Sequence, residues 1–170
     1  MEKLLFNKLD PKQINENAIK LIGFDWMLIT AGTIDNFNTM TAAWGQIGFL
    51  WNRPIATTYI RPTRYTYDFA EKFDTFSLCF FEESFKPVLN LLGTKSGRDI
   101  NKMQTEGLTS FNGQHSVCFK EAKLIIECRK IYADDIKPEL FIDSAIDKSY
   151  PKKDYHRFYI GEILNCLVKA

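Results

Sequence analysis

The feature that most constrains this 170-residue chain is a succession of β-forming segments with few helical segments between them. Apolar or β-branched runs recur at residues 26–30, 55–60 and 75–81. Strands of a parallel sheet alternate with helices, because each connection must cross the sheet. Strands that mostly follow one another instead favour an antiparallel barrel with attached helices. The other expected strands are 39–44, 117–119, 123–132 and 158–168.

Four short helices are expected, at residues 12–22, 66–72, 85–92 and 99–105. In the first, Ile14, Ala18 and Ile19 fall on one face, and Gly23 is a common helix stop. In the second, Thr66 is the candidate N-cap, because its hydroxyl can accept a bond from a free backbone N–H. These helices are too few for a regular β-α-β alternation.

The composition predicts one folded domain spanning residues 1–170. The chain is 45% hydrophobic and 14% aromatic, which excludes disordered and coiled-coil classes. Lys and Arg number 22 against 21 Asp and Glu, so the net charge of +1 gives no general attraction to polyanions. No apolar run approaches the ~20 residues of a membrane span, and the first eight residues carry no hydrophobic signal core. We therefore expect a cytoplasmic protein that binds neither nucleic acid nor a membrane.

Cysteine and histidine spacing predicts no metal site. No Cys-x-x-Cys pair occurs, and two histidines, His115 and His156, are too few for the usual zinc ligand sets. We assign no role to His115. Buried, reduced thiols are expected at Cys79, Cys118, Cys128 and Cys166.

Searches for catalytic motifs find no nucleotide-binding glycine fingerprint, no phosphate loop, no nucleophile elbow and no metalloprotease helix. A chain so poor in acid–base candidates would take its reactivity from a cofactor if it is an enzyme. We therefore expect no catalytic side chain, and look for residues that would hold such a cofactor.

The first candidate cluster is residues 38–45. Asn38, Thr39 and Thr41 offer donors and acceptors near a turn, and Trp44 offers a flat apolar surface. The alternative is a hairpin whose polar residues only satisfy its own turn.

Two basic segments, residues 59–66 and 93–99, are the next candidates. Both are predicted to open helices, where free N–H groups suit an anion, and arginine can clamp a phosphate. The second loop contains Lys95, Ser96 and Arg98. Together the loops indicate a small phosphorylated ligand, although solvated loops with ordinary caps are the alternative. The last candidate, His156, precedes an apolar strand, where the alternative is a structural histidine.

In this order, the clusters resemble the flavin reductase-like, FMN-binding split-barrel family, and most of all its flavoredoxin branch. The matching segments are residues 38–45, 52–54, 61–66 and 95–99, within a resemblance that runs from about residue 18 to 164. His156-x-x-x-x-Gly161 is similar to the end of the family's Gly-Asp-His-x-x-x-x-Gly signature. Asp154-Tyr155 stands where Gly-Asp is usual in the reductase-component branch.

The resemblance implies a mainly β fold, a six-stranded antiparallel Greek-key split barrel, and a homodimer with one non-covalent FMN per subunit near the interface. Residues implied to border the flavin ring and ribityl chain are Asn38, Thr39, Met40, Thr41 and Trp44. Those implied at the ribityl or phosphate end are Thr63, Arg64, Thr66, Lys95 and Ser96, with Arg61 and Arg98 as weaker candidates. His156 would approach the flavin ring or the nicotinamide side, from its own or the other subunit.

The function implied is an FMN-dependent oxidoreductase, either an NAD(P)H:flavin reductase or a flavoredoxin-like electron carrier. The sequence leaves these two open, because the family holds NAD(P)H without a dinucleotide-binding fold. Two other classes remain: a non-catalytic protein that binds FMN or another phosphorylated ligand, and an oligonucleotide-binding barrel. The neutral net charge counts against the last, since several phosphate contacts need a basic face.

Overall fold

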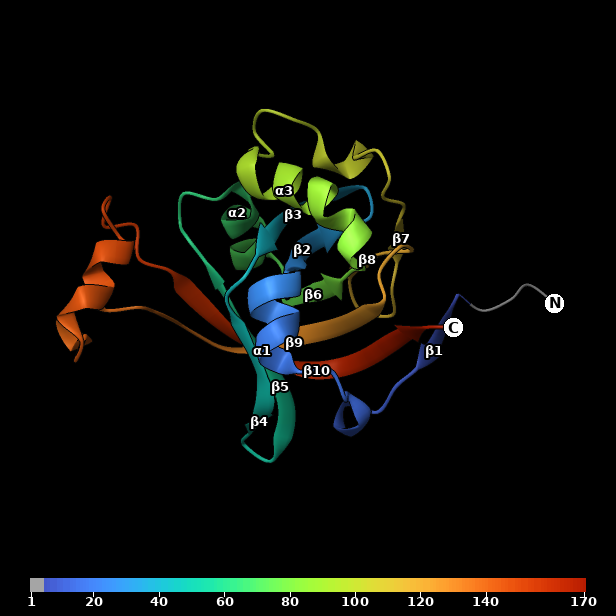
Figure 1. Cartoon of the computed structure of the whole chain (residues 1–170), viewed down its shortest axis with the longest axis horizontal. Coiled ribbons are helices and arrows are strands. Elements are labelled where there is room, and N and C mark those ends of the chain that lie inside the picture. The colour runs from blue at the N-terminus through green and yellow to red at the C-terminus, as the bar shows by residue number, and fades with distance from the viewer. Residues whose placement is uncertain (1–4) are drawn as a thin grey trace.

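A strongly curved antiparallel sheet organises the molecule in the computed structural model, which describes residues 5–170 (Figure 1). Its strand order is β3-β2-β6-β9-β10-β5-β4, and β1 also pairs with β10. The strands are β1 (Phe6–Lys8), β2 (Met27–Thr33), β3 (Asn36–Ala42), β4 (Gly45–Leu50), β5 (Arg53–Ile60), β6 (Thr75–Phe80), β9 (Leu124–Asp135) and β10 (Arg157–Lys169). A separate hairpin joins β7 (Ser110–Asn112) to β8 (Val117–Phe119). The expected mainly β, antiparallel class is confirmed, with eight strands instead of six in the main sheet of the described chain.

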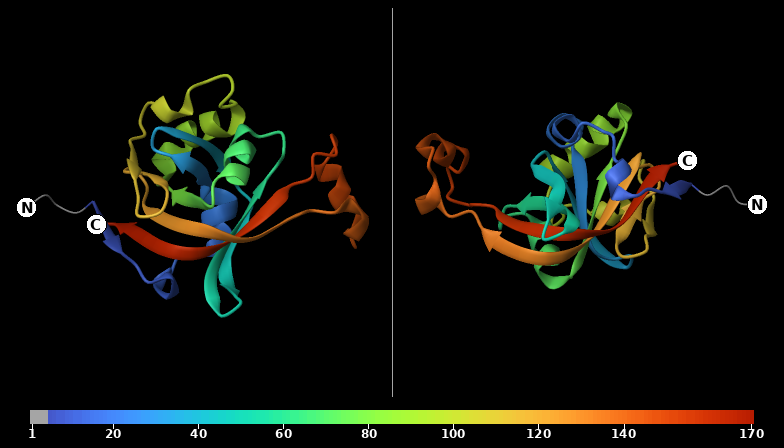
Figure 2. Two further views of the ribbon diagram at one scale, coloured as in Figure 1. Left: turned by 180° about the vertical axis from the view of Figure 1, so that it is seen from behind. Right: turned by 90° about the horizontal axis from the view of Figure 1, so that it is seen from below.

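Helices pack against both faces of the sheet: the α1 turn and α2 contribute to the core cluster inside its curve, and α3 to the cluster on the other face. Two long hairpins project from the sheet (Figures 1 and 2). The helices are α1 (Ala18–Lys20), which continues as a π-type turn (Leu21–Asp25), α2 (Tyr65–Lys72) and α3 (Lys86–Thr94). Single 3-10 turns lie at Pro11–Gln13, Glu83–Phe85, Lys102–Gln104, Pro138–Leu140 and Ser144–Ser149. The last two belong to the segment between β9 and β10, residues 136–156, which extends far from the sheet and is called the arm below.

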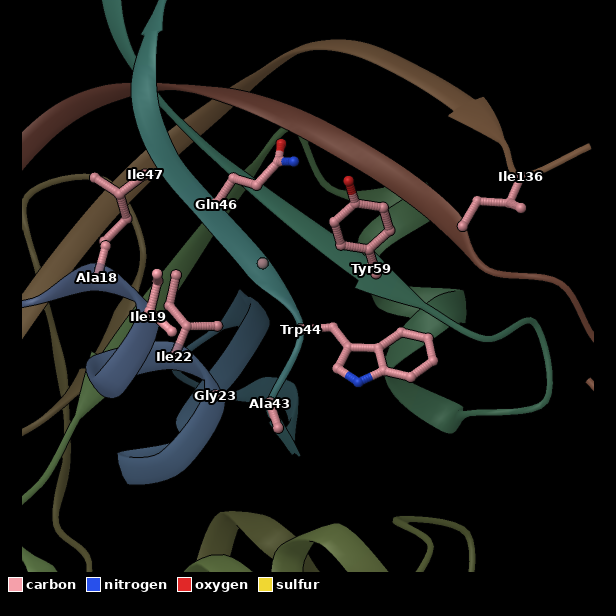
Figure 3. Close-up of a pocket in the computed structure, with 11 residues that line it drawn as sticks. Ala18, Ile19, Ile22, Gly23, Ala43, Trp44, Gln46, Ile47, Tyr59 and Ile136 are labelled. Atoms are coloured by element: carbon pink, nitrogen blue, oxygen red, sulfur yellow. The ribbon is translucent and has the colours of Figure 1, made fainter. Parts of the chain in front are cut away.

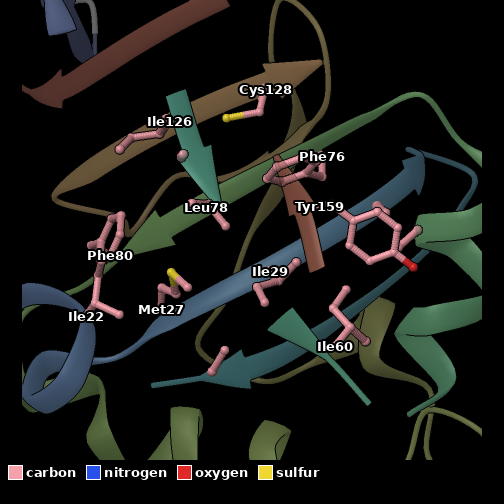
Figure 4. Close-up of a cluster of buried hydrophobic side chains, with 14 of the residues drawn as sticks. Ile22, Met27, Ile29, Ile60, Phe76, Leu78, Phe80, Ile126, Cys128 and Tyr159 are labelled. Atoms are coloured by element: carbon pink, nitrogen blue, oxygen red, sulfur yellow. The ribbon is translucent and has the colours of Figure 1, made fainter. Parts of the chain in front are cut away.

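The central strands are apolar on both faces because both faces are buried. Along β2, Met27 and Ile29 belong to a core cluster inside the curve of the sheet, whereas Leu28 between them packs in a second cluster with α3 and β8. Figure 4 shows side chains of the first cluster, among them Ile29, Leu78 and Ile126 from the adjacent strands β2, β6 and β9. Because successive side chains of a strand point to opposite faces, one continuous apolar run contributes to both core clusters.

The first expected helix is displaced. Residues 12–22 do not form one helix, because Asn17 caps a helix that starts at Ala18, with its side-chain oxygen accepting from the Lys20 N–H at 3.0 Å. The helical turns pass through Gly23 and end at Asp25, and Ile19 is 76% exposed instead of buried. Leu21 and Ile22 are the residues of this segment that pack into the core.

Two expectations about the basic loops are wrong. Thr66 does not cap α2, since Arg64 holds the N-cap position, and the Thr66 hydroxyl accepts from the Asn38 amide at 2.7 Å. The loop 93–99 does not open a helix: Lys95 is the C-cap of α3, and of residues 99–105 only Lys102–Gln104 form a 3-10 turn. Any anion there would be held by side chains, because the free backbone groups at a helix C-terminus are carbonyls.

Strand β4 is absent from the sequence-based expectation for a local reason. It joins β5 through a two-residue turn of Trp51 and Asn52, both with positive φ (50° and 59°). Such turns normally contain glycine or an Asn-Gly pair, so a turn made of Trp51 and Asn52 does not indicate a hairpin in the sequence. The four cysteines are buried and free, as expected. Within residues 5–170, no helix is long and apolar enough to cross a membrane.

We predict that Gly161 is required for packing. A Cβ atom there would lie 2.6 Å from Cys128 Cβ and 2.7 Å from Phe76 Cζ. Gly161→Ala should therefore lower the free energy of unfolding by about 1–3 kcal/mol, the usual cost of overpacking, measured by urea denaturation. Gly48→Ala, in exposed β4 with nothing within 4 Å, is the matched control and should be close to neutral. Equal losses in the two variants would contradict this packing role.

Candidate functional site

Strand pairing brings the first basic loop and His156 together. Strand β10 pairs with β5 so that Arg157 lies opposite Ile60. His156 comes directly before Arg157, and Arg61 directly after Ile60, so the two side chains meet at the end of the paired region. The end of β3 reaches the same place, because Met40, Trp44 and His156 line one cavity of about 200 Å³. We call it the aromatic cavity.

An aromatic cluster forms one wall of this cavity. The Trp44 indole lies 4.7 Å from the His156 imidazole between centroids, and Tyr59 approaches the same imidazole edge-on at 6.5 Å. The Tyr150 hydroxyl lies 2.9 Å from His156 Nδ1. Trp44 itself is 46% exposed, so a flat apolar face borders open space.

A larger cavity of about 540 Å³ continues past Trp44, between the α1 turn and β4 (Figure 3). Figure 3 shows Ile22, Ala43, Trp44 and Tyr59 among the side chains around it. Ala43, Trp44 and Tyr59 line both cavities, and no residue lining this larger one is charged. We call it the apolar cavity.

On its other side, the aromatic cavity adjoins a small space of about 80 Å³, which we call the cationic cavity. Arg64 lines both. The other groups around the cationic cavity include the cations Lys95 and Lys102 and the hydroxyl residues Thr63, Thr66 and Ser96.

Arg64 is the most informative residue of this arrangement. Its Nη1 donates to the Gly93 carbonyl at 2.8 Å, whereas its Nη2 is buried without a hydrogen-bond partner among the described residues. Burial, and then the charge of Arg61, lowers its pKa. A buried, unpaired guanidinium N–H is costly, and an anionic ligand would satisfy it.

The other arginines have carboxylate partners. Arg61 Nη1 donates to Asp154 at 2.6 Å and its guanidinium lies 4.8 Å from the centre of the Tyr150 ring, which attaches the arm to the first loop. Arg98 is exposed and donates to Asp68 at 2.8 Å, facing a different cavity from Arg64. These two cations are therefore already neutralised.

Most of the residues singled out from the sequence come together here. Those lining the aromatic cavity are Met40, Thr41, Trp44, Arg61, Arg64 and His156. Those lining the cationic cavity, besides Arg64, are Asn38, Thr63, Thr66, Lys95 and Ser96. Thr39 does not join them: its hydroxyl is fully buried, 2.9 Å from that of Thr30. Arg98 lies outside both cavities.

Three residues of the site had no signal in the sequence. In the sequence, Tyr59 and Tyr150 cannot be distinguished from other aromatic residues of strands and loops. Lys102 could not be told apart from the other 21 Lys and Arg residues, although it is only 4% exposed. No group of three or more His, Cys, Asp or Glu residues in the described chain is placed to hold a metal ion.

A family model described as flavin reductase like domain matches residues 22–170. The chain belongs to this family. Among solved structures, flavoredoxin of Desulfovibrio vulgaris (Miyazaki F) is 20% identical with a TM-score of 0.66, and the match covers 93% of this chain and 76% of that one.

Two further solved structures share the fold. The FMN-binding protein from Thermus thermophilus with bound 1-cyclohex-2-enone is 19% identical, with a TM-score of 0.66, 98% of this chain covered and 79% of that one. The styrene monooxygenase flavin reductase from Pseudomonas putida S12 is 13% identical, with a TM-score of 0.60, 84% of this chain covered and 77% of that one. No curated protein matches the sequence. At these identities the structures show the split-barrel fold, and the resemblance expected from the sequence is confirmed.

We predict that His156 is neutral in the folded protein down to acidic pH. Burial, and then the nearby charge of Arg61, lowers its pKa from 6.5 to about 4. Because the unfolded chain takes up the proton first, the contribution of neutral His156 to stability is present above pH 6.5 and is lost as the pH falls toward 4.

The measurement is the free energy of unfolding of wild type and His156→Gln as a function of pH. Other titrations largely cancel in the difference, which should shrink between pH 7 and 4 by at most about 3 kcal/mol. A constant difference would mean that His156 titrates alike in the folded and unfolded chain.

Proposed function

We propose that this family member binds FMN non-covalently and is an oxidoreductase that passes electrons between the flavin and a donor or acceptor. The observation that carries the proposal is the run of three adjoining cavities, from apolar through aromatic to cationic, with the unpaired Arg64 N–H at the cationic end. FMN changes character in the same direction, from a flat ring system through a polyhydroxylated chain to a phosphate, so its ring suits the apolar and aromatic cavities and its chain and phosphate suit the cationic cavity.

The residues divide among these parts by chemistry. Arg64, Lys95, Ser96 and Thr63 suit a phosphate, because they supply N–H and O–H donors around one small space. Asn38 and Thr66, already bonded to each other at 2.7 Å, suit the hydroxylated chain. Trp44 and His156 border the space for the ring. Bound flavin would supply the hydride and electron chemistry, and these residues would orient it and exclude water from one face.

His156 belongs to this division as a neutral group. It lines the cavity beside Trp44 of the same chain, so no second subunit is needed to bring it there. With its pKa lowered to about 4 it carries no charge near neutral pH, and it suits a role in shaping the space over the ring.

NAD(P)H is one donor for such a flavin and a redox protein is another. The alternative function is a non-catalytic protein that stores or senses FMN or another phosphorylated ligand, and the same cavities would serve it. The visible spectrum of the purified protein and its anaerobic bleaching by NADH or NADPH test these proposals. A yellow protein that is bleached supports a reductase, and one that is not bleached favours a carrier or a binding protein. A protein that stays colourless after addition of FMN would refute flavin binding.

We predict that Arg64 and Arg98 differ in their effect on FMN affinity, although both were singled out from the sequence. Arg64→Ala should weaken FMN binding by roughly 1–3 kcal/mol, the range for a lost charge-assisted hydrogen bond, and riboflavin binding much less. Arg98→Ala is the matched control, because Asp68 already neutralises Arg98 at the surface. Isothermal titration with both flavins measures this. Equal losses for FMN and riboflavin in Arg64→Ala would show that the loop does not hold a phosphate.

We further propose a homodimer in the cytoplasm. Large apolar side chains are exposed at the tip of the β4–β5 hairpin, at Phe49 and Trp51, and on the arm, at Leu140 and Ile142. Clusters of this kind mark interaction surfaces, and obligate dimer interfaces often bury on the order of 2,000 Å² or more.

We predict that light scattering at micromolar concentration with FMN present gives twice the 19.7 kDa chain mass. Trp51→Glu together with Ile142→Glu should shift the protein toward monomer without unfolding it, because both side chains face solvent in the single chain. A monomer mass for the wild type would refute the dimer.

A further inference from the structure

Lys102 is a buried cation that the proposed division of residues leaves without a role. Only 4% of it is exposed, and its Nζ donates to two carbonyl oxygens, those of Leu92 at 2.7 Å and Thr39 at 3.0 Å. It forms no ion pair with any carboxylate of residues 5–170. Two carbonyls use two of the three N–H donors of an ammonium group, so one donor has no partner among residues 5–170.

The surroundings of Lys102 increase the cost of its charge. From the loop before α2, Arg64 repels it, and burial together with this repulsion lowers its pKa to about 8. Lys95, after α3, lines the same cavity, and β3 contributes only the uncharged Asn38 there. On the far side of the loop, Arg98 and Asp99 line a separate cavity with Lys102. Buried charges are normally paired, and this one has like charges as its nearest neighbours in the cationic cavity.

We propose that Lys102, with Arg64, forms a binding site for a phosphate dianion at the base of the cationic cavity, and so selects phosphorylated flavin over riboflavin. This rests on the proposed function, since the phosphate is that of FMN. Two adjacent desolvated cations attract a dianion far more strongly than exposed ones, because water screens them less. Lys102 would thus contribute to ligand specificity together with Arg64, and it is more buried than Arg64 or Lys95.

Because of this arrangement, FMN binding should be accompanied by uptake of a proton at Lys102. A phosphate monoester is a dianion at pH 8, since its second pKa is near 6. Its charge beside Lys102 raises the lysine pKa, so lysines that were neutral in the free protein become protonated on binding. At pH 8, near the lysine pKa in the free protein, uptake should approach about half a proton per FMN bound. Riboflavin has no phosphate and should cause none.

The experiment compares wild type, Lys102→Gln and Lys120→Gln by isothermal titration with FMN and with riboflavin. Glutamine keeps an N–H donor for the two carbonyls and removes the charge, and Lys120 is an exposed control outside these cavities. Titrations at pH 8 in two buffers of different ionisation enthalpy give the number of protons taken up. Thermal melts of each protein check that it is folded.

For Lys102→Gln we expect FMN affinity to fall about 10- to 100-fold, the equivalent of one charge-assisted hydrogen bond, with riboflavin within about threefold of wild type. FMN-linked proton uptake should disappear, and Lys120→Gln should behave as wild type. Equal losses for both flavins, or uptake that persists in Lys102→Gln, would overturn the proposal and leave Lys102 as a structural residue. Failure of the wild type to bind FMN would instead refute the proposed function.

Discussion

The antiparallel pairing of β10 with β5 and β9 is the constraint on which the rest of the structure depends. One strand, Arg157–Lys169, is bonded to β5 along its first half, to β9 along most of its length and to β1 at its end. The register with β5 leaves His156 and Arg61 as neighbours where the pairing stops. The register with β9 determines where the arm leaves the sheet (Figure 2). The site and the arm are therefore two consequences of one strand's position.

The ion pair between Arg61 and Asp154, at 2.6 Å, joins the site to the arm. It holds the base of the arm against the loop before α2, and Tyr150 adds a ring beside Arg61 and a hydroxyl next to His156. Asp154 neutralises Arg61, so the cations of the site left without a carboxylate partner among residues 5–170 are those of the cationic cavity, with Arg64 and Lys102 more buried than Lys95. The arm is thus the reason that Arg61 has a counter-ion whereas Arg64, in the same loop, has none among residues 5–170.

The three adjoining cavities change in character from apolar through aromatic to cationic. At the cationic end, backbone carbonyl oxygens accept hydrogen bonds from the buried cations. Gly93 accepts from Arg64, and Thr39 and Leu92 accept from Lys102. These bonds compensate only part of the desolvation cost of two positive charges. A site that is electrostatically unfavourable when empty and neutralised when an anion binds is typical of functional regions, which proteins maintain at the expense of stability.

The sequence by itself determined the fold class and most of the side chains of the site. Alternating and continuous apolar runs marked β2, β5, β6, β9 and β10, and the order of the polar clusters identified the family, because both are local patterns in the chain. It did not determine the capping of α2, the strand β4 behind the Trp51–Asn52 turn, or the inward face of Thr39. Nor could it distinguish Arg98 from Arg64, or Lys102 from surface lysines. The differences among these cations depend on which side chains gain a carboxylate partner and which lose contact with water. Both are decided by contacts between residues far apart in sequence: Arg61 with Asp154, Arg98 with Asp68, and Lys102 with the Thr39 carbonyl.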